Sequence, residues 1–181
     1  MPIDVAQAIR QRRSTRSFQQ KELPKELLLQ IVEAGIWAPN GGNAQTWVFV
    51  VVTEGDRLRH IRAVSPGILG TPAAVVAICQ DKELAEEKGG RLARETASVM
   101  DSAMAGENIM LYAVGAGVGS CAVLSFHKEA VRQLLGLPQA IVPELLITLG
   151  YAAEENPLPR REFQSVCFFE KYGIAHGSRA E

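Results

Sequence analysis

The chain has 181 residues, a length that suits one compact domain with a sizeable hydrophobic core. Apolar residues make up 47% and charged residues 22%, as is ordinary for a globular protein in water. The formal charge is −1, so no overall basic excess favours nucleic acid as a partner.

The chain carries no signal for export or for a membrane. Met1–Arg13 is charged and has no apolar stretch of the secretory type, and no run approaches the roughly 18 apolar residues of a spanning helix. The three cysteines lie far apart without CxxC spacing, which argues against a metal knuckle or a redox dithiol. We therefore expect a cytoplasmic protein that keeps its thiols reduced.

The first third of the chain predicts two helices, a loop and a strand. A short helical stripe follows Asp4, a good N-cap. A second helix can begin at Pro24, and it must end near Pro39 because proline disfavours helix in the preceding residue. Residues 40–43 read as a loop, and residues 47–52 as a buried strand.

Helices and strands continue to alternate along the rest of the chain. The pattern predicts helices at 56–62, 84–116 and 128–135 and strands at 73–79, 145–151 and 166–169, with 118–123 irregular or extended. The half of the long helix after Ala97 has too little polar surface to be exposed, so it is central or at an interface. The class is α/β or α+β, and no linker divides the chain.

Basic residues gather near the start of the chain. Arg10, Arg12, Arg13 and Arg16 fall within seven positions, with Ser14 among them. Guanidinium groups bind phosphate through paired hydrogen bonds, so the cluster predicts a phosphorylated ligand. The alternative is a solvated helix end whose charges complement the helix dipole.

Three stretches together resemble the FMN-dependent nitroreductase family. They are Arg12-Arg13-Ser14-Thr15-Arg16-Ser17-Phe18, then Ala38-Pro39-Asn40-Gly41-Gly42-Asn43-Ala44-Gln45-Thr46-Trp47-Val48-Phe49, and finally Asn108-Ile109-Met110-Leu111 with Gly115-Ala116-Gly117-Val118-Gly119-Ser120-Cys121. Each motif alone is weak, but their order and separations match the family from about Ile3 to Phe169.

The resemblance implies an α+β fold with a mainly antiparallel central sheet flanked by helices. It implies one FMN-binding domain over residues 1–181, with its core at about 3–169. It also implies a homodimer with two FMN sites at the interface and a domain-swapped C-terminal arm. In that arrangement the strand expected at 166–169 would join the partner's sheet.

The resemblance also implies a role for each arginine of the cluster. Arg12 and Ser14 match positions that bind the FMN phosphate, and Arg13 matches a position nearer the ribityl chain. Arg16 matches the basic residue near flavin N1 and the C2 carbonyl, where a cation stabilises the reduced flavin. Either Arg160 or Arg161 would close the phosphate site.

Two further segments match parts of the flavin site. One is the loop that covers the flavin from the other subunit, with the residues Pro39, Asn40, Gly41, Asn43 and Gln45. Asn43 and Gln45 have an alternative role as plain turn residues. The other segment lies beside flavin N5, where a backbone N–H can bond to it, and comprises Val123, Leu124 and Ser125.

The sequence departs from the family pattern at three places. Thr46 stands where proline is usual before Trp47, and Leu124-Ser125 replaces a more usual glycine-rich pair. The region from Thr53 to Thr71 is short and has no clear match to the family's polar flavin contact. These departures put the loop geometry and the N5 contact in question.

The implied activity is that of an FMN-dependent oxidoreductase. NADH or NADPH would reduce the flavin, and a nitroaromatic, quinone or similar planar acceptor would take two electrons in a ping-pong cycle. The alternatives are a specialised enzyme of the same fold, such as a reductive dehalogenase or an enone reductase, and a flavin-storage protein. A nucleic-acid-binding module is disfavoured by the balanced charge and the lack of interleaved aromatics.

Overall fold

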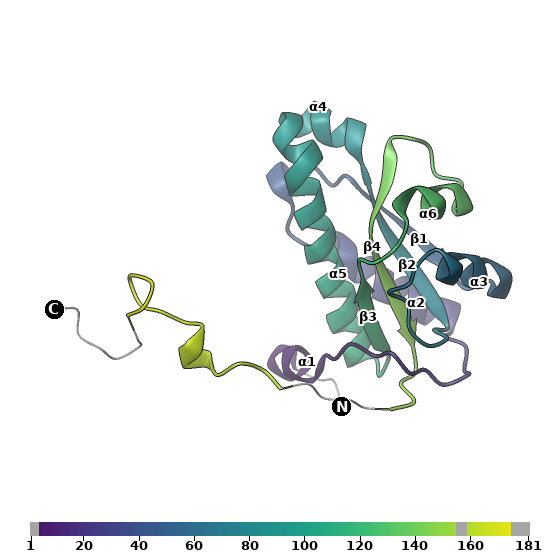
Figure 1. Cartoon of the computed structure of the whole chain (residues 1–181), viewed down its shortest axis with the longest axis horizontal. Helices are drawn as coiled ribbons and strands as arrows, with labels where there is room; N and C mark the ends of the chain where they lie inside the picture. Colours follow the sequence, from purple (N-terminus) through teal and green to yellow (C-terminus); the bar gives the residue numbers. More distant parts are fainter. Residues whose placement is uncertain (1–3, 155–158, 175–181) are drawn as a thin grey trace.

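The computed structural model describes residues 4–154 and 159–174. Their order along the chain is α1 (Val5–Gln11), α2 (Lys25–Glu33), η1 (Ala34–Trp37), η2 (Gly41–Asn43), β1 (Trp47–Val52), α3 (Gly55–Ala63), β2 (Ala74–Asp81), α4 (Lys82–Leu92), η3 (Ala93–Ala97), α5 (Ser98–Gly115), β3 (Gly119–Val123), α6 (Lys128–Leu134), β4 (Ile141–Gly150) and η4 (Phe163–Ser165). Figure 1 shows these elements around one sheet. Among the described helices, none is long and apolar enough to cross a membrane.

The sheet has four strands in the order β1-β2-β4-β3, and every neighbouring pair is antiparallel. Its side chains alternate between two hydrophobic clusters, as the two-residue period of a strand requires. Val76 and Ile147 face α2 and α5 on one side, whereas Val75 and Leu146 face α3 and α6 on the other. This arrangement confirms the predicted α+β class with helices on both faces.

The strand β4 begins four residues earlier than the hydrophobic run predicts, and Pro143 lies inside it. The pairing shifts between Ile78–Leu145 and Cys79–Pro143, so Glu144 is an extra residue on β4. A β-bulge of this kind tolerates proline in an internal strand. The buried Glu144 carboxylate then pairs with Lys82 at 2.6 Å and with Lys128.

The prediction of unbroken helix from 84 to 116 is wrong. Gly89 and Gly90 have non-helical backbone angles, and Gly90 is in the left-handed region at φ 64°. Glycine reaches that region without steric cost, so the chain kinks there. A π turn, η3, then joins α4 to α5. The apolar half of the segment forms α5, whose Ile109 and Ala113 are fully buried.

Two buried cysteines give no sign of nucleophilic chemistry. Cys79 is fully buried in the central strand β2, and desolvation, with a smaller contribution from Glu144, raises the pKa of its thiol to about 12. Cys121 is also buried, on β3. The reactive thiolate is therefore suppressed at Cys79, which fits a structural role for that residue.

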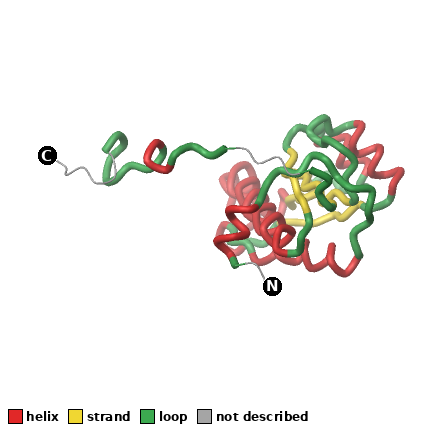
Figure 2. Tube along the Cα trace, turned by 90° about the horizontal axis from the view of Figure 1, so that it is seen from below, coloured by secondary structure: helices red, strands yellow, loops and turns green. Residues whose placement is uncertain are grey.

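The C-terminal segment leaves the globular body, as Figures 1 and 2 show. The described residues 159–174 include η4 but no strand, so the strand expected at 166–169 is not seen. A strand needs a neighbouring edge for its backbone hydrogen bonds, and this segment lies away from the chain's own sheet (Figure 2).

Candidate cofactor-binding site

A cleft of about 680 Å³ opens where the basic segment crosses the end of α5 and the start of β3. Ligand sites commonly have volumes of about 300–1,000 Å³. The cleft is lined by Gln11, Arg13, Ser14, Thr15, Arg16, Ser17, Val114, Gly117, Val118, Gly119, Ser120, Ala152 and Glu154. Three of the predicted phosphate and flavin residues therefore line one cavity.

Backbone pairing fixes the basic segment beside β3. Ser14 pairs in parallel with Ser120, and the Thr15 N–H donates to the Ser120 carbonyl at 2.8 Å. Gly119 permits this approach, since a Cβ there would lie 2.5 Å from Thr15 Oγ1. The glycine-rich stretch after α5 thus allows the segment that carries the arginines to pack closely beside β3.

The Arg13 side chain lies between the end of α1 and the cleft. Its Nη1 donates to the carbonyl of Arg12 at 2.8 Å and to that of Arg10, at the carboxyl end of α1. An arginine at this position complements the helix dipole. The same side chain also lines the cleft, together with the exposed Arg16, whose Nη1 lies 3.5 Å from the Ser14 carbonyl.

The Arg12 side chain is turned towards α5 instead. Its Nε forms an ion pair with Glu107 at 3.2 Å, and Arg12 is absent from the residues that line the cleft. The family resemblance implied that Arg12 binds the FMN phosphate and that Arg13 lies nearer the ribityl chain. Of this pair, only Arg13 is among the residues that line the cleft.

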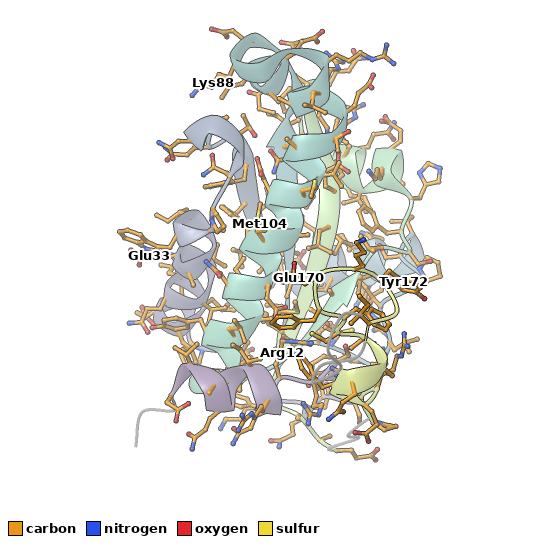
Figure 3. The ribbon with its side chains drawn as sticks, turned by 90° about the vertical axis from the view of Figure 1, so that its left-hand side faces the viewer. Arg12, Glu33, Lys88, Met104, Glu170 and Tyr172 are labelled. Atoms are coloured by element: carbon orange, nitrogen blue, oxygen red, sulfur yellow. The ribbon has the colours of Figure 1, made fainter. Side chains whose placement is uncertain are left out.

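The loop at 39–45 lies at the far end of α5 from the arginines. The Gly41 N–H donates to Asp101 Oδ1 at 3.1 Å, and Lys88 Nζ donates to the Ala44 carbonyl at 3.0 Å. Figure 3 shows Lys88 and Arg12 at opposite ends of the molecule, with Met104 between them. Asp101 and Gly115 are separated by about 21 Å of helix, at 1.5 Å per residue. One chain therefore does not bring the two motifs together.

The stretch predicted beside flavin N5 lies at the end of β3. The Val123 side chain is buried in the core, whereas Leu124 is 76% exposed. The Ser125 carbonyl accepts from the Gly67 N–H at 2.9 Å. Gly70, three residues further, packs against the Arg16 carbonyl, so the segment 67–70 connects this stretch to the basic segment.

The two C-terminal arginines lie on the arm. Both Arg160 and Arg161 are exposed, and Arg161 Nη2 donates to the Ser165 carbonyl at 3.1 Å. Neither arginine is among the residues that line the cleft of its own chain.

Sequence reasoning missed two buried polar residues. Ser120 lines the cleft, and its buried hydroxyl has no hydrogen-bond partner within the described parts of the chain. Asp101 is only 4% exposed within the apolar helix α5. The sequence did contain a signal for Asp101. A carboxylate among Ala, Met, Ile and Val is costly to bury unless it is hydrogen-bonded or paired.

Asp101 makes a pH-dependent contribution to stability. Burial raises the pKa of its carboxyl above the usual range, and the hydrogen bond from Gly41 opposes this in part. The folded state therefore holds the proton more tightly than the unfolded state, and stability falls as pH rises from about 4 through the raised pKa.

We expect Asp101→Asn, which cannot titrate, to gain stability relative to the wild type over that pH interval. Urea denaturation of both proteins from pH 3.5 to pH 7 measures the difference. A difference that stays constant with pH would contradict the raised pKa.

Comparison with known proteins agrees with this geometry. The family model described as the nitroreductase family matches residues 9–71 and 62–151. A protein named NADH dehydrogenase/NAD(P)H nitroreductase from Methanothermobacter thermautotrophicus is 33% identical over 89% of this chain and 83% of its own length. An FMN reductase (NADPH) from Bacillus subtilis is 24% identical over 90% of this chain and 72% of its own length.

A solved structure has the same fold. It is that of an NADH dehydrogenase/NAD(P)H nitroreductase from Bacteroides thetaiotaomicron, which is 26% identical, covers 93% of this chain and 98% of its own, and has a TM-score of 0.80. The matched family segments contain the basic segment, the loop at 39–45 and the glycine-rich end of α5. The chain therefore belongs to the nitroreductase family, an oxidoreductase family, as the three sequence motifs predicted.

Proposed function

We propose that the protein is an FMN-dependent NAD(P)H oxidoreductase that reduces planar acceptors such as quinones or nitroaromatics. The observation that carries the proposal is the cleft that Arg13, Ser14 and Arg16 line together. Relatives named as an NAD(P)H nitroreductase and as an FMN reductase (NADPH) support the same cofactor and electron donor. The proposal places the enzyme in the cytoplasm and treats residues 1–181 as one domain.

The residues of the cleft suit FMN. Arg13, with its charged guanidinium, and the Ser14 hydroxyl would bind the phosphate. The Ser120 hydroxyl, which has no partner among the described residues, adds a polar group at the same place. Arg16 is exposed and would lie along the flavin ring, where its positive charge favours electron uptake. Arg12, paired with Glu107, would hold the basic segment against α5.

When bound, FMN supplies the two-electron chemistry, accepting a hydride from a nicotinamide and passing electrons to an acceptor. The protein orients the reactants: backbone at Val123, Leu124 and Ser125 would face the reactive edge of the flavin. The exposed Leu124 leaves an apolar surface there for a planar molecule. Donor and acceptor would use this surface in turn, which gives a ping-pong cycle.

A homodimer would complete the site. The loop at 39–45 and the cleft lie at opposite ends of α5 (Figure 3), so a two-fold axis across α5 would place the loop of each subunit beside the cleft of the other. Trp37 is 78% exposed and Tyr112 is 44% exposed. Together they line an apolar groove of about 800 Å³ between α1, α2 and α5. Packing of a partner subunit over this groove would bury both side chains.

The C-terminal arm would complete the same interface. Phe163 and Tyr172 are exposed on it, and the arm lies away from its own sheet (Figure 1). Packing on a partner subunit would bury these side chains and bring Arg160 or Arg161 towards a phosphate. We propose this domain-swapped position for the arm.

A subunit-mixing experiment tests the shared site. Arg16→Ala would damage the cleft, and Asn43→Ala would damage the loop, so each variant homodimer has two defective sites. A heterodimer of the two variants, purified with two affinity tags, contains one intact site and one doubly defective site. We expect about half of the wild-type quinone reductase activity to return in that heterodimer.

The control is a heterodimer of Arg16→Ala with Arg13→Ala, two changes on the same side of the site. It pairs a damaged cleft with a damaged cleft and should recover nothing. A stable Arg16→Ala/Asn43→Ala heterodimer that stays as inactive as its parents would rule out a site shared between subunits.

A further inference from the structure

The loop at 40–45 has an unusual backbone. Gly42, Asn43 and Gln45 all lie in the left-handed region, at φ 57°, 54° and 51°. Non-glycine residues rarely adopt these angles, and they persist only where the surrounding structure enforces them. Within the loop, the Asn40 side chain accepts from the Gln45 N–H at 3.0 Å, and the carbonyls of Asn40 and Gly41 accept from the N–H groups of Asn43 and Ala44. These local bonds do not attach the loop to the rest of the molecule.

Two charged side chains from other elements form hydrogen bonds with the backbone of the loop. Asp101 on α5 accepts from the Gly41 N–H at 3.1 Å, and Lys88 on α4 donates to the Ala44 carbonyl at 3.0 Å. The two bonds reach opposite ends of the loop and are charge-assisted, which makes them stronger than bonds between neutral groups. Lys88 is the last residue before Gly89, where the helical backbone breaks.

A buried polar chain ties the end of the loop to the same helix. Thr46 Oγ1 donates to Gln80 Oε1 at 2.6 Å, and Gln80 Nε2 donates to Ser102 Oγ at 2.8 Å. All three residues are buried. Ser102 directly follows Asp101 on α5, so the beginning and the end of the loop are anchored to adjacent residues of one helix.

The junction between α4 and α5 is connected to the sheet through Lys82. Lys82 Nζ contacts Glu144 on β4 at 2.6 Å, Ser98 Oγ at 2.8 Å and the Arg94 carbonyl at 3.1 Å. Arg94 lies in the π turn between α4 and α5, where backbone hydrogen bonds span five residues instead of four. The contacts of Lys82 hold α4 and α5, and with them Lys88 and Asp101, in a fixed relation to the sheet.

We propose that Asp101 and Lys88 are positioning residues that hold the loop at 40–45 in the shape with which it covers the FMN of the partner subunit. This inference rests on the proposed function, since it takes the loop to be part of a flavin site. The two residues act through the loop and touch neither the flavin nor the substrate. Their removal should loosen cofactor binding much more than it slows electron transfer.

Amide hydrogen exchange of the full-length protein, measured with and without FMN, tests directly whether Asp101 and Lys88 hold the loop. We expect Lys88→Met to speed exchange of the backbone amides at 41–45 about tenfold, the factor that one charge-assisted bond is worth. FMN should also dissociate about tenfold faster, while its reduction at saturating NAD(P)H changes less than about twofold. Lys88→Arg, which can still donate to the Ala44 carbonyl, should restore both.

Two further variants separate positioning from general destabilisation. Lys25→Met removes an exposed lysine on α2 and should leave loop exchange unchanged. Asp101→Asn keeps an oxygen that can accept from Gly41 but loses the charge, so loop exchange should fall between the wild type and Asp101→Ala, and Asp101→Ala should resemble Lys88→Met. If neither Lys88→Met nor Asp101→Ala changes the rate of amide hydrogen exchange in the loop, the two residues do not position it.

The outcomes also distinguish this inference from the proposed function. If the wild-type protein takes up no FMN, the proposed function is wrong, and the role of the loop above a flavin is wrong with it. If FMN binds and is reduced but neither variant alters loop exchange or FMN dissociation, only the positioning role is wrong.

Discussion

Replacing Gly70 by alanine is expected to lower the free energy of unfolding by about 3 kcal/mol, from left-handed strain and overpacking together. Gly70 has a φ of 69°, and an added Cβ would lie 2.4 Å from the Arg16 carbonyl oxygen. Backbone cannot rotate away as a side chain does, so the segment that carries Arg16 must shift. Affinity for FMN should fall together with stability.

Gly136→Ala is the matched control for this change. Gly136 also has a positive φ, of 65°, but an added Cβ would meet nothing within 4 Å. Gly136→Ala should lower the free energy of unfolding only by the conformational strain, about 1 kcal/mol, and should leave FMN affinity unchanged. Urea denaturation and FMN titration measure both quantities. Equal losses of stability in the two variants would show that the close approach to Arg16 is unimportant.

Replacing Arg16 by alanine is expected to weaken FMN binding by about 10- to 100-fold, since a hydrogen bond to a charged group contributes about 1.5–3 kcal/mol. Arg16 is exposed and takes part in none of the ion pairs found in the described regions, so stability should change by less than about 0.5 kcal/mol. Reduction of the remaining bound flavin should also be slower, because the nearby positive charge is lost.

Two substitutions make the Arg16 experiment specific. Arg16→Lys keeps the charge without the planar guanidinium and should fall between the wild type and Arg16→Ala. Arg57→Ala removes an exposed arginine from α3, on the opposite face of the sheet, and should leave FMN affinity unchanged. If Arg57→Ala weakens FMN binding as much as Arg16→Ala, the effect comes from overall charge and Arg16 has no special position.

The regular elements were predictable where a local pattern decides them. Runs of β-branched residues indicated β1 and β2, and Pro39 marked the end of the second helical segment. Long-range pairing decided the exceptions. The strand predicted at 145–151 begins already at Ile141, because the bulge at Glu144 accommodates Pro143 within β4. The kink at Gly89 and Gly90 was hidden within a helical pattern that continued on both sides.

The sequence identified the motifs of the candidate site, but it did not reveal how their residues are arranged in space. The motif suggested that Arg12, Arg13 and Arg16 act together, but only tertiary contacts show Arg12 paired with Glu107 and Arg13 facing the cleft. The motif at 39–45 and the basic segment are separated by the length of α5, a distance that no sequence spacing reveals. The proposed completion of each site by a partner subunit likewise depends on surfaces that form only after folding.

The visible spectrum of the purified protein, recorded without oxygen as NADH and then NADPH are added, tests the proposed activity most directly. We expect a yellow flavin spectrum that one or both nucleotides bleach. After the nucleotide is removed, a quinone or nitroaromatic should restore the colour, as a ping-pong cycle requires. A colourless protein that takes up no added FMN, or bound flavin that neither nucleotide reduces, would contradict an NAD(P)H-dependent flavin oxidoreductase.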